Sequence, residues 1–130
     1  MANVGIVLIS HSQKVAEGVK DIISEAVSNV TVIPSGGTEE GGIGTSAPKI
    51  QGAVEEADSG NGVLLLYDIG SAGMNAEMAV ELADKENCSV ADNIPLVEGG
   101  YVAAVEAGMG KSVDEILASL QDSFLPERKK

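Results

Sequence analysis

Two short apolar runs constrain the fold of this chain more than any other feature, because neither alternates with polar residues. The segment from Asn3 to Ser10 is apolar and rich in β-branched residues, and the segment from Val63 to Tyr67 reads Val-Leu-Leu-Leu-Tyr. Strands of this kind lie inside parallel sheets that helices cover on both faces. With no Trp, one Phe and two Tyr in 130 residues, the core has to be built from aliphatic side chains.

Helical patterns separate these strands from two weaker ones. We expect strands at 3–10, 30–33, 63–67 and 88–91. The expected helices lie between the N-cap Ser12 and Asn29, between Pro48 and Gly60, and at 74–86, 97–107 and 113–124. Ser112 and Glu115 have the spacing of a capping box at the start of the last helix.

Apolar spacing predicts which helix faces are buried. In the first helix, one stripe is predicted to face the sheet: Val15, Val19, Ile22, Ile23 and Ala26. In the third helix, Met78 and Leu82 are predicted to point inward. We also expect Cys88 to be a small buried hydrophobic residue.

The alternation of strands and helices predicts a single α/β domain of three layers with a parallel sheet in the order 2-1-3-4. We assign residues 1–125 to this domain and expect 126–130 to be a frayed tail. In this order the first and third strands end side by side, where the winding reverses and where open α/β sheets bind ligands.

Composition excludes several classes of function. The chain has 20 acidic and 8 basic residues, for a net charge of −12, which disfavours nucleic acids and anionic membranes as partners. One Cys and one His cannot form a disulfide or a structural zinc site, so we expect a cytoplasmic protein that binds no metal. The first apolar run is too short for a signal peptide or a membrane span.

The single histidine stands directly after the first strand, and an aspartate stands directly after the third. We expect Asp68 to lie within reach of His11 across the two strand ends. A carboxylate bonded to one ring nitrogen fixes the tautomer and leaves the other nitrogen free as a nucleophile. The alternative is that both residues only cap helices or turns.

A glycine-rich loop from Pro34 to Ala47 opens on the same edge. It supplies hydroxyl groups and flexible amides that are suited to hold an anion: Gly36, Gly37, Thr38, Gly44, Thr45 and Ser46. The helix that starts near Ser12 points its positive end to the same place, and Lys14 is the only base we expect nearby. The loop matches no nucleotide-binding motif, and such a loop is equally often a mobile surface segment.

Together these residues resemble a known family, the phosphotransfer subunit of phosphoenolpyruvate-dependent dihydroxyacetone kinase, which is related to mannose-type IIA domains of the bacterial phosphotransferase system. The resemblance extends over essentially the whole chain, and the segments that mark it are Ser10-His11-Ser12 with 15–18, Gly36-Gly37-Thr38, Gly44-Thr45-Ser46, 68–72 with Met74-Asn75, and 95–99. Ser71 and Met74 join the candidate phosphate- or partner-binding residues.

The resemblance implies a phosphohistidine carrier. His11 would accept a phosphoryl group from the histidine-containing phosphocarrier protein HPr and pass it to ADP on the nucleotide-binding subunit of the kinase, which then phosphorylates dihydroxyacetone. Asp68 would orient the histidine through its δ nitrogen, so we predict phosphorylation of the ε nitrogen. The chain itself would bind no cofactor, and the resemblance implies a homodimer.

Three other interpretations stay open. A sugar-transport IIA domain of the mannose type would use the same histidine and donor but pass the group to a IIB domain. A flavodoxin-like or receiver-like module would bind a ligand or partner without carrying phosphate, although receivers gather acids at the strand ends whereas this first strand ends in Ser-His. A purely structural subunit is the third.

Overall fold

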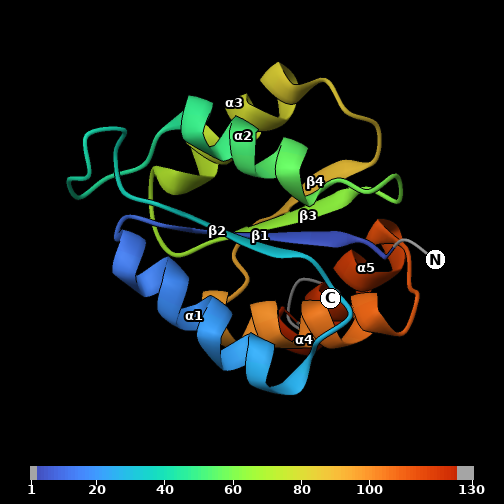
Figure 1. The fold of residues 1–130 in the computed structure, drawn as a ribbon. Helices are drawn as coiled ribbons and strands as arrows, with labels where there is room; N and C mark the ends of the chain where they lie inside the picture. The colour runs from blue at the N-terminus through green and yellow to red at the C-terminus, as the bar shows by residue number, and fades with distance from the viewer. Residues whose placement is uncertain (1–2, 126–130) are drawn as a thin grey trace.

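The computed structural model describes residues 3–125, which form a four-stranded parallel sheet between two layers of helices (Figure 1). The strands are β1 (Gly5–Ser10), β2 (Val32–Gly36), β3 (Val63–Tyr67) and β4 (Cys88–Ala91), in the order β2-β1-β3-β4. The helices are α1 (Gln13–Ala26), α2 (Ala47–Ala57), α3 (Ala72–Ala83), α4 (Leu96–Gly108) and α5 (Val113–Phe124). The predicted fold class and strand order are therefore confirmed, while the predicted tail at 126–130 lies outside the described residues.

The sheet has a separate hydrophobic core on each face. Figure 1 shows α1, α4 and α5 on one side and α2 and α3 on the other. Alternate residues of β1 point to opposite sides, so that Ile6 and Leu8 pack with α1, α4 and α5 while Val7 and Ile9 pack with α2 and α3. All six residues of β1 are buried, as expected for a central strand whose two faces are both covered.

Strand register decides which loops meet at the carboxyl edge of the sheet. Ser10 pairs with Gly36 on β2, and Ile9 pairs with Tyr67 on β3. Asp68, which follows β3, is therefore level with Ser10, and His11, which follows β1, lies one residue further along the chain. Which residues meet at this edge therefore depends on where β1, β2 and β3 end as well as on the order of the strands.

The predicted face of α1 is partly wrong. Ala16, Val19 and Ile23 are buried, whereas Val15 and Ile22 are about half exposed, at 48% and 55%, and Ala26 is also exposed. The helix begins at Gln13 and turns the small Ala16 toward the sheet, where it is fully buried. The spacing of apolar residues alone does not decide which of two overlapping faces of a helix is buried.

The same error occurs in α3. Met78 and Leu82 are about half exposed, at 53% and 51%, and the helix buries small residues instead: Ala72, Gly73, Ala76 and Ala79. Gly73 lies against the ring of Tyr67, where an added Cβ would come within 2.9 Å of the ring carbon. Helix α3 therefore packs closely against the sheet and against α2, and its larger apolar side chains stay outside.

Several predicted boundaries also shift. Helix α1 ends at Ala26, before Asn29, and α3 occupies Ala72–Ala83 and ends at Asp84, which adopts a left-handed conformation. Strand β2 continues through Pro34 to Gly36, and this proline is tolerated because β2 is an edge strand. Cys88 is only partly buried.

The last helix agrees with its prediction at both ends. Ser112 accepts a hydrogen bond from the amide of Glu115, whose carboxylate accepts one from the amide of Ser112, so the predicted capping box is present. In residues 3–125, no helix has both the length and the apolar character needed to cross a membrane.

Candidate functional site

The carboxyl ends of β1, β2 and β3 bring three loops together at one edge. Two hydrogen bonds tie the glycine-rich loop to the end of β1, from the amide of Gly37 to the carbonyl of Ser10 (3.2 Å) and from the amide of Gly44 to the carbonyl of His11 (2.8 Å). This loop is therefore anchored at both of its ends beside the histidine.

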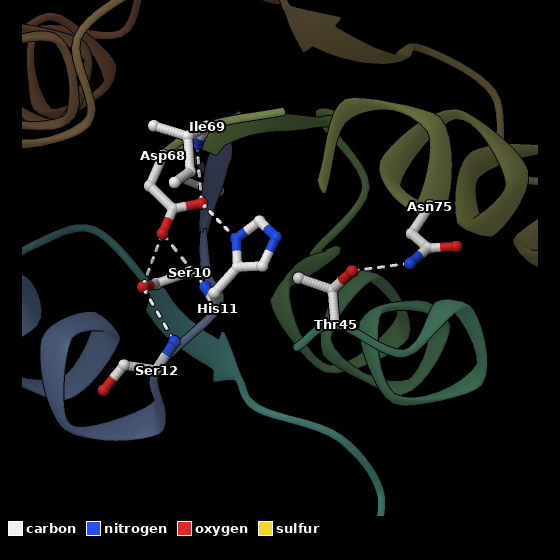
Figure 2. A network of polar contacts seen from close by, with 7 residues as sticks. All are labelled: Ser10, His11, Ser12, Thr45, Asp68, Ile69 and Asn75. Carbon is white, nitrogen blue, oxygen red and sulfur yellow. Dashed lines mark hydrogen bonds and ion pairs between the residues drawn. The ribbon is translucent and has the colours of Figure 1, made fainter. Parts of the chain in front are cut away.

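His11 and Asp68 are in contact, as the predicted strand order requires. Nδ1 of His11 lies 3.0 Å from Oδ1 of Asp68, and the backbone amide of His11 donates to Oδ2 across 3.0 Å (Figure 2). The amide of Ile69 also donates to Oδ1 (2.7 Å), and the hydroxyl of Ser10 donates to Oδ2 (2.9 Å). The carboxylate therefore accepts four hydrogen bonds, two on each oxygen.

These contacts determine the charge of the aspartate. Burial alone would raise the pKa of Asp68, but the hydrogen bonds from His11, Ile69 and Ser10 outweigh it and hold the pKa below its ordinary value of 3.8. The carboxylate is thus ionised at neutral pH and can only accept hydrogen bonds. Nδ1 of His11 must then carry the proton, which leaves the lone pair of the neutral ring on Nε2.

The other ring nitrogen, Nε2, points away from Asp68, toward the side where Figure 2 shows Thr45 and Asn75. Thr45 lies just before α2, and Asn75 lies in the first turn of α3. The amide nitrogen of Asn75 donates a hydrogen bond to the hydroxyl oxygen of Thr45. His11 is thus placed between an anionic acceptor and a neutral polar pair, with its side chain 25% exposed.

The other predicted hydroxyl groups mostly serve the local structure. Ser12 caps α1 through the amide of Val15, and Ser46 caps α2 through the amide of Lys49. Thr38 accepts from the amide of Gly42 inside the loop. Ser71 is exposed and makes no side-chain cap of α3, and the side chain of Met74 is 77% exposed beside it.

The three predicted glycine amides also have partners within the protein. The amide of Gly36 donates to Oε1 of Gln13 (2.9 Å), and those of Gly37 and Gly44 hold the loop to β1. Gly36 has to lack a side chain, because an added Cβ would lie 2.5 Å from the carbonyl oxygen of Ser12. These glycines shape the edge by close packing and turn formation.

Sequence reasoning placed the wrong base near this edge. Lys14 is exposed on α1, whereas Nζ of Lys49, in the first turn of α2, donates to the carbonyl oxygen of Gly36 (2.6 Å). Nζ of Lys49 also lies 3.5 Å from Oε1 of Gln13. Nothing in the local pattern of α2 marks this lysine, because its acceptors come from β2 and α1.

Ser10 and Asn75 are the other site residues without an assigned role in the sequence reasoning. Ser10 is buried at the last position of β1, where its hydroxyl accepts from the amide of Ser12 (3.1 Å) and donates to Asp68. A hydroxyl at the end of an otherwise apolar strand was the available signal for Ser10. The available signal for Asn75 was its place in the matching segment Met74-Asn75, whereas its partner Thr45 is 30 residues away and does not follow from the local pattern.

A cleft of about 550 Å³ lies on the β4 side of Asp68. Its lining comes from the last residue of β3 and from the loops that follow β3 and β4: Tyr67, Asp68, Ile69, Gly70, Asn93, Ile94 and Pro95. The hydroxyl of Tyr67 donates to Asp92 (3.0 Å) at the same place. Among residues 3–125 no group of three His, Cys, Asp or Glu side chains is arranged to hold a metal ion.

Comparison with known families identifies this architecture. The profile of the family EIIA-man, described as the PTS system fructose IIA component, matches residues 5–117. The chain belongs to the EIIA-man family. The match includes His11, Asp68 and every strand of the sheet.

Individual relatives of this EIIA-man chain carry a more specific description. A protein of Listeria innocua named PEP-dependent dihydroxyacetone kinase 1, phosphoryl donor subunit DhaM, is 43% identical over 90% of this chain and 92% of its own. A Lactococcus lactis protein named PTS-dependent dihydroxyacetone kinase, phosphotransferase subunit DhaM, is 38% identical over 93% and 96%. A solved structure of a protein of unknown function superposes with a TM-score of 0.82 at 33% identity, covering 94% of this chain and 95% of the other.

Proposed function

We propose that this chain is the phosphoryl donor subunit of a PEP-dependent dihydroxyacetone kinase and carries the phosphoryl group on Nε2 of His11. The observation that carries the proposal is the contact between Nδ1 of His11 and Oδ1 of Asp68, which leaves the nucleophilic lone pair on Nε2, on the side of the ring away from Asp68. The names of relatives that match nearly the whole chain support the reaction class.

The transfer step follows from this geometry. The Nε2 lone pair of His11 forms the N–P bond while the bond between phosphorus and the donor atom breaks, and that electron pair leaves with the donor. The ring keeps its Nδ1 proton and becomes cationic, and the ionised Asp68 compensates that charge. Phosphoryl transfer has a loose transition state, so a positioned nucleophile and charge stabilisation meet its main demands.

The donor in this proposal is the phosphocarrier protein HPr, and the acceptor is ADP on the nucleotide-binding subunit of the kinase. The net charge of −12 favours partners with a basic docking surface. The protein acts in the cytoplasm as a homodimer, with no nucleotide or metal of its own. The same geometry serves a mannose-type IIA domain, but the dihydroxyacetone kinase descriptions of the relatives favour the kinase.

A labelling experiment tests the carrier function. Radiolabelled phosphoenolpyruvate, supplied with the two general phosphotransferase proteins, is expected to label the wild-type chain at an acid-labile, alkali-stable site and to leave His11→Ala unlabelled. Phosphorus NMR of the product is expected to show the resonance of an Nε2-phosphorylated ring. Label on His11→Ala would refute the carrier function.

A second measurement distinguishes the two acceptors. The isolated phosphoprotein is mixed with the ADP-loaded nucleotide-binding subunit in one reaction and with a mannose-type IIB domain in another. We expect rapid formation of ATP in the first reaction and no loss of label in the second. Rapid transfer to the IIB domain alone would assign the chain to sugar transport.

A further inference from the structure

We infer that Thr45 and Asn75 form a neutral clamp for the phosphoryl oxygens on the side of His11 opposite to Asp68. This inference rests on the proposed function and adds the two residues that stabilise the transferred group. Figure 2 shows the arrangement, with Asp68, the imidazole ring of His11 and the Thr45–Asn75 pair following one another from left to right.

The glycine amides at this edge are already engaged, which leaves few donors for an anion. Gly36, Gly37 and Gly44 donate to Gln13, Ser10 and His11 within the protein, and Ser12 and Ser46 accept from amides in their own helices. Lys49 is held by the carbonyl of Gly36. Of the seven side chains drawn in Figure 2, Thr45 and Asn75 are the two on the side of the ring away from Asp68.

The hydrogen bond between the pair sets the direction of its remaining protons. Because the amide nitrogen of Asn75 donates to Oγ1 of Thr45, the hydroxyl proton of Thr45 is directed elsewhere. The second proton on the amide nitrogen of Asn75 takes no part in this hydrogen bond, so it can be donated to a phosphoryl oxygen. Both side chains are only partly buried, so an incoming phosphoryl group can reach them.

The pair is also held in place by the fold. Thr45 directly precedes Ser46, the cap of α2, and Asn75 lies in the first turn of α3. These two helices pack against each other and share one hydrophobic core with β1 and β3. The hydrogen bond therefore joins two helix starts in front of His11, and the donors are preorganised for the charge that arrives on Nε2.

The test uses a small phosphoryl donor, so that partner docking does not contribute. Phosphoramidate transfers its phosphoryl group to Nε2 as its own P–N bond breaks and ammonia leaves. We expect Thr45→Val and Asn75→Ala to be labelled about tenfold to a hundredfold more slowly than wild type, because each loses a hydrogen bond to a charged group. Thr45→Ser should restore most of the rate.

Asn75→Asp distinguishes a pair that binds the phosphoryl group from a hydrogen bond that only joins the starts of α2 and α3. An aspartate can still accept a hydrogen bond from Thr45 and so keep the bridge, but it donates none and adds negative charge beside the phosphoryl group. We therefore expect Asn75→Asp to be labelled more slowly than Asn75→Ala. Thermal unfolding of each variant checks that the fold is retained.

Matched controls make the same chemical changes at the opposite end of the sheet. Thr31→Val removes an exposed hydroxyl before β2, and Asn29→Ala removes an amide that donates to the carbonyl of Gly108. Both are expected to react at the wild-type rate. Wild-type rates for Thr45→Val and Asn75→Ala, or an Asn75→Asp rate at or above that of Asn75→Ala, would overturn the clamp. A labelled His11→Ala would instead overturn the carrier function.

Discussion

Ser10 donates its hydroxyl proton to Oδ2 of Asp68 across 2.9 Å, and Oγ of Ser10 accepts the amide proton of Ser12 across 3.1 Å. One buried hydroxyl thus joins the end of β1, the start of α1 and the aspartate that follows β3. The position of the carboxylate relative to His11 is therefore set by the strand end as well as by its own loop.

Replacing Ser10 tests this connection. Ser10→Ala leaves a partly buried carboxylate oxygen of Asp68 and the amide of Ser12 with one partner fewer each, so we expect a loss of about 1–3 kcal/mol in the free energy of unfolding. The pKa of Asp68 should also rise, because one of the hydrogen bonds that lower it is lost. Urea unfolding and carboxyl NMR titration measure the two effects. Ser59→Ala, which removes a hydroxyl that donates to the carbonyl of Asn3, is the control and should leave the Asp68 pKa unchanged.

Replacing the aspartate by its amide should change the histidine tautomer. In Asp68→Asn, the side-chain amide can donate to Nδ1, which places the ring proton on Nε2 and removes the nucleophilic lone pair. We expect phosphoryl acceptance to fall by about a hundredfold or more. Long-range proton–nitrogen correlation reports the tautomer directly, since His11 is the sole histidine in the sequence. Asp92→Asn, on the neighbouring loop, should retain the wild-type tautomer, and a wild-type tautomer in Asp68→Asn would contradict the orienting role.

The depressed pKa of Asp68 also predicts a pH dependence of stability. A carboxyl group whose pKa is lower in the folded than in the unfolded protein stabilises the fold above the unfolded pKa. This contribution is lost as pH falls below the ordinary value of 3.8 and through the folded pKa. The difference in unfolding free energy between wild type and Asp68→Asn should therefore be constant near neutral pH and shrink in acid. Urea unfolding at several pH values measures it, and a difference that grows in acid would refute the pKa direction.

Gly36 should not tolerate a side chain, although its neighbours suggest a flexible loop. Its added Cβ would lie 2.5 Å from the carbonyl oxygen of Ser12 and 2.6 Å from Cα of Gln13, so the backbone has to move. We expect Gly36→Ala to destabilise the protein by about 1–3 kcal/mol and to slow phosphorylation of His11. Gly18→Ala on α1 meets no atom within 4 Å and should instead stabilise the helix by about 0.5–1 kcal/mol. Equal effects of the two substitutions on unfolding would contradict this packing.

Lys49 should contribute to the loop and Lys14 should not. Lys49→Met removes the donor to the carbonyl of Gly36, and a hydrogen bond to a charged group is worth about 1.5–3 kcal/mol. We expect lower stability and faster amide hydrogen exchange at Gly37 and Gly44. Lys14→Met, an identical change on exposed α1, is expected to leave both unchanged. If the two variants exchange alike, the Lys49 contact does not hold the loop.

Much of the site follows from local patterns together with one topological rule. The apolar runs that become β1 and β3 are recognisable as buried strands, and the predicted strand order 2-1-3-4 then makes their ends neighbours. This was sufficient to predict that His11 and Asp68 approach each other. The capping residues Ser12 and Ser112 were also predictable, because a helix cap depends only on residues a few positions apart.

Contacts between distant segments were not predictable in the same way. The buried faces of α1 and α3 depend on how closely each helix approaches the sheet, and close approach selected Ala16 and Ala76 over Val15 and Met78. The roles of Lys49 and Asn75 depend on acceptors supplied by Gly36 and Thr45, which reach them only in the folded chain.

The sequence by itself determined the order of strands and helices and, through the residues that end the strands, which side chains stand at the carboxyl edge. Only the tertiary structure decided which hydrogen bonds those side chains make. The reason is physical: strand and helix formation depend on neighbours along the chain, whereas the proton on Nδ1 of His11 depends on Asp68, 57 residues away. The same holds for the donors that face Nε2, which the packing of α2 against α3 brings together.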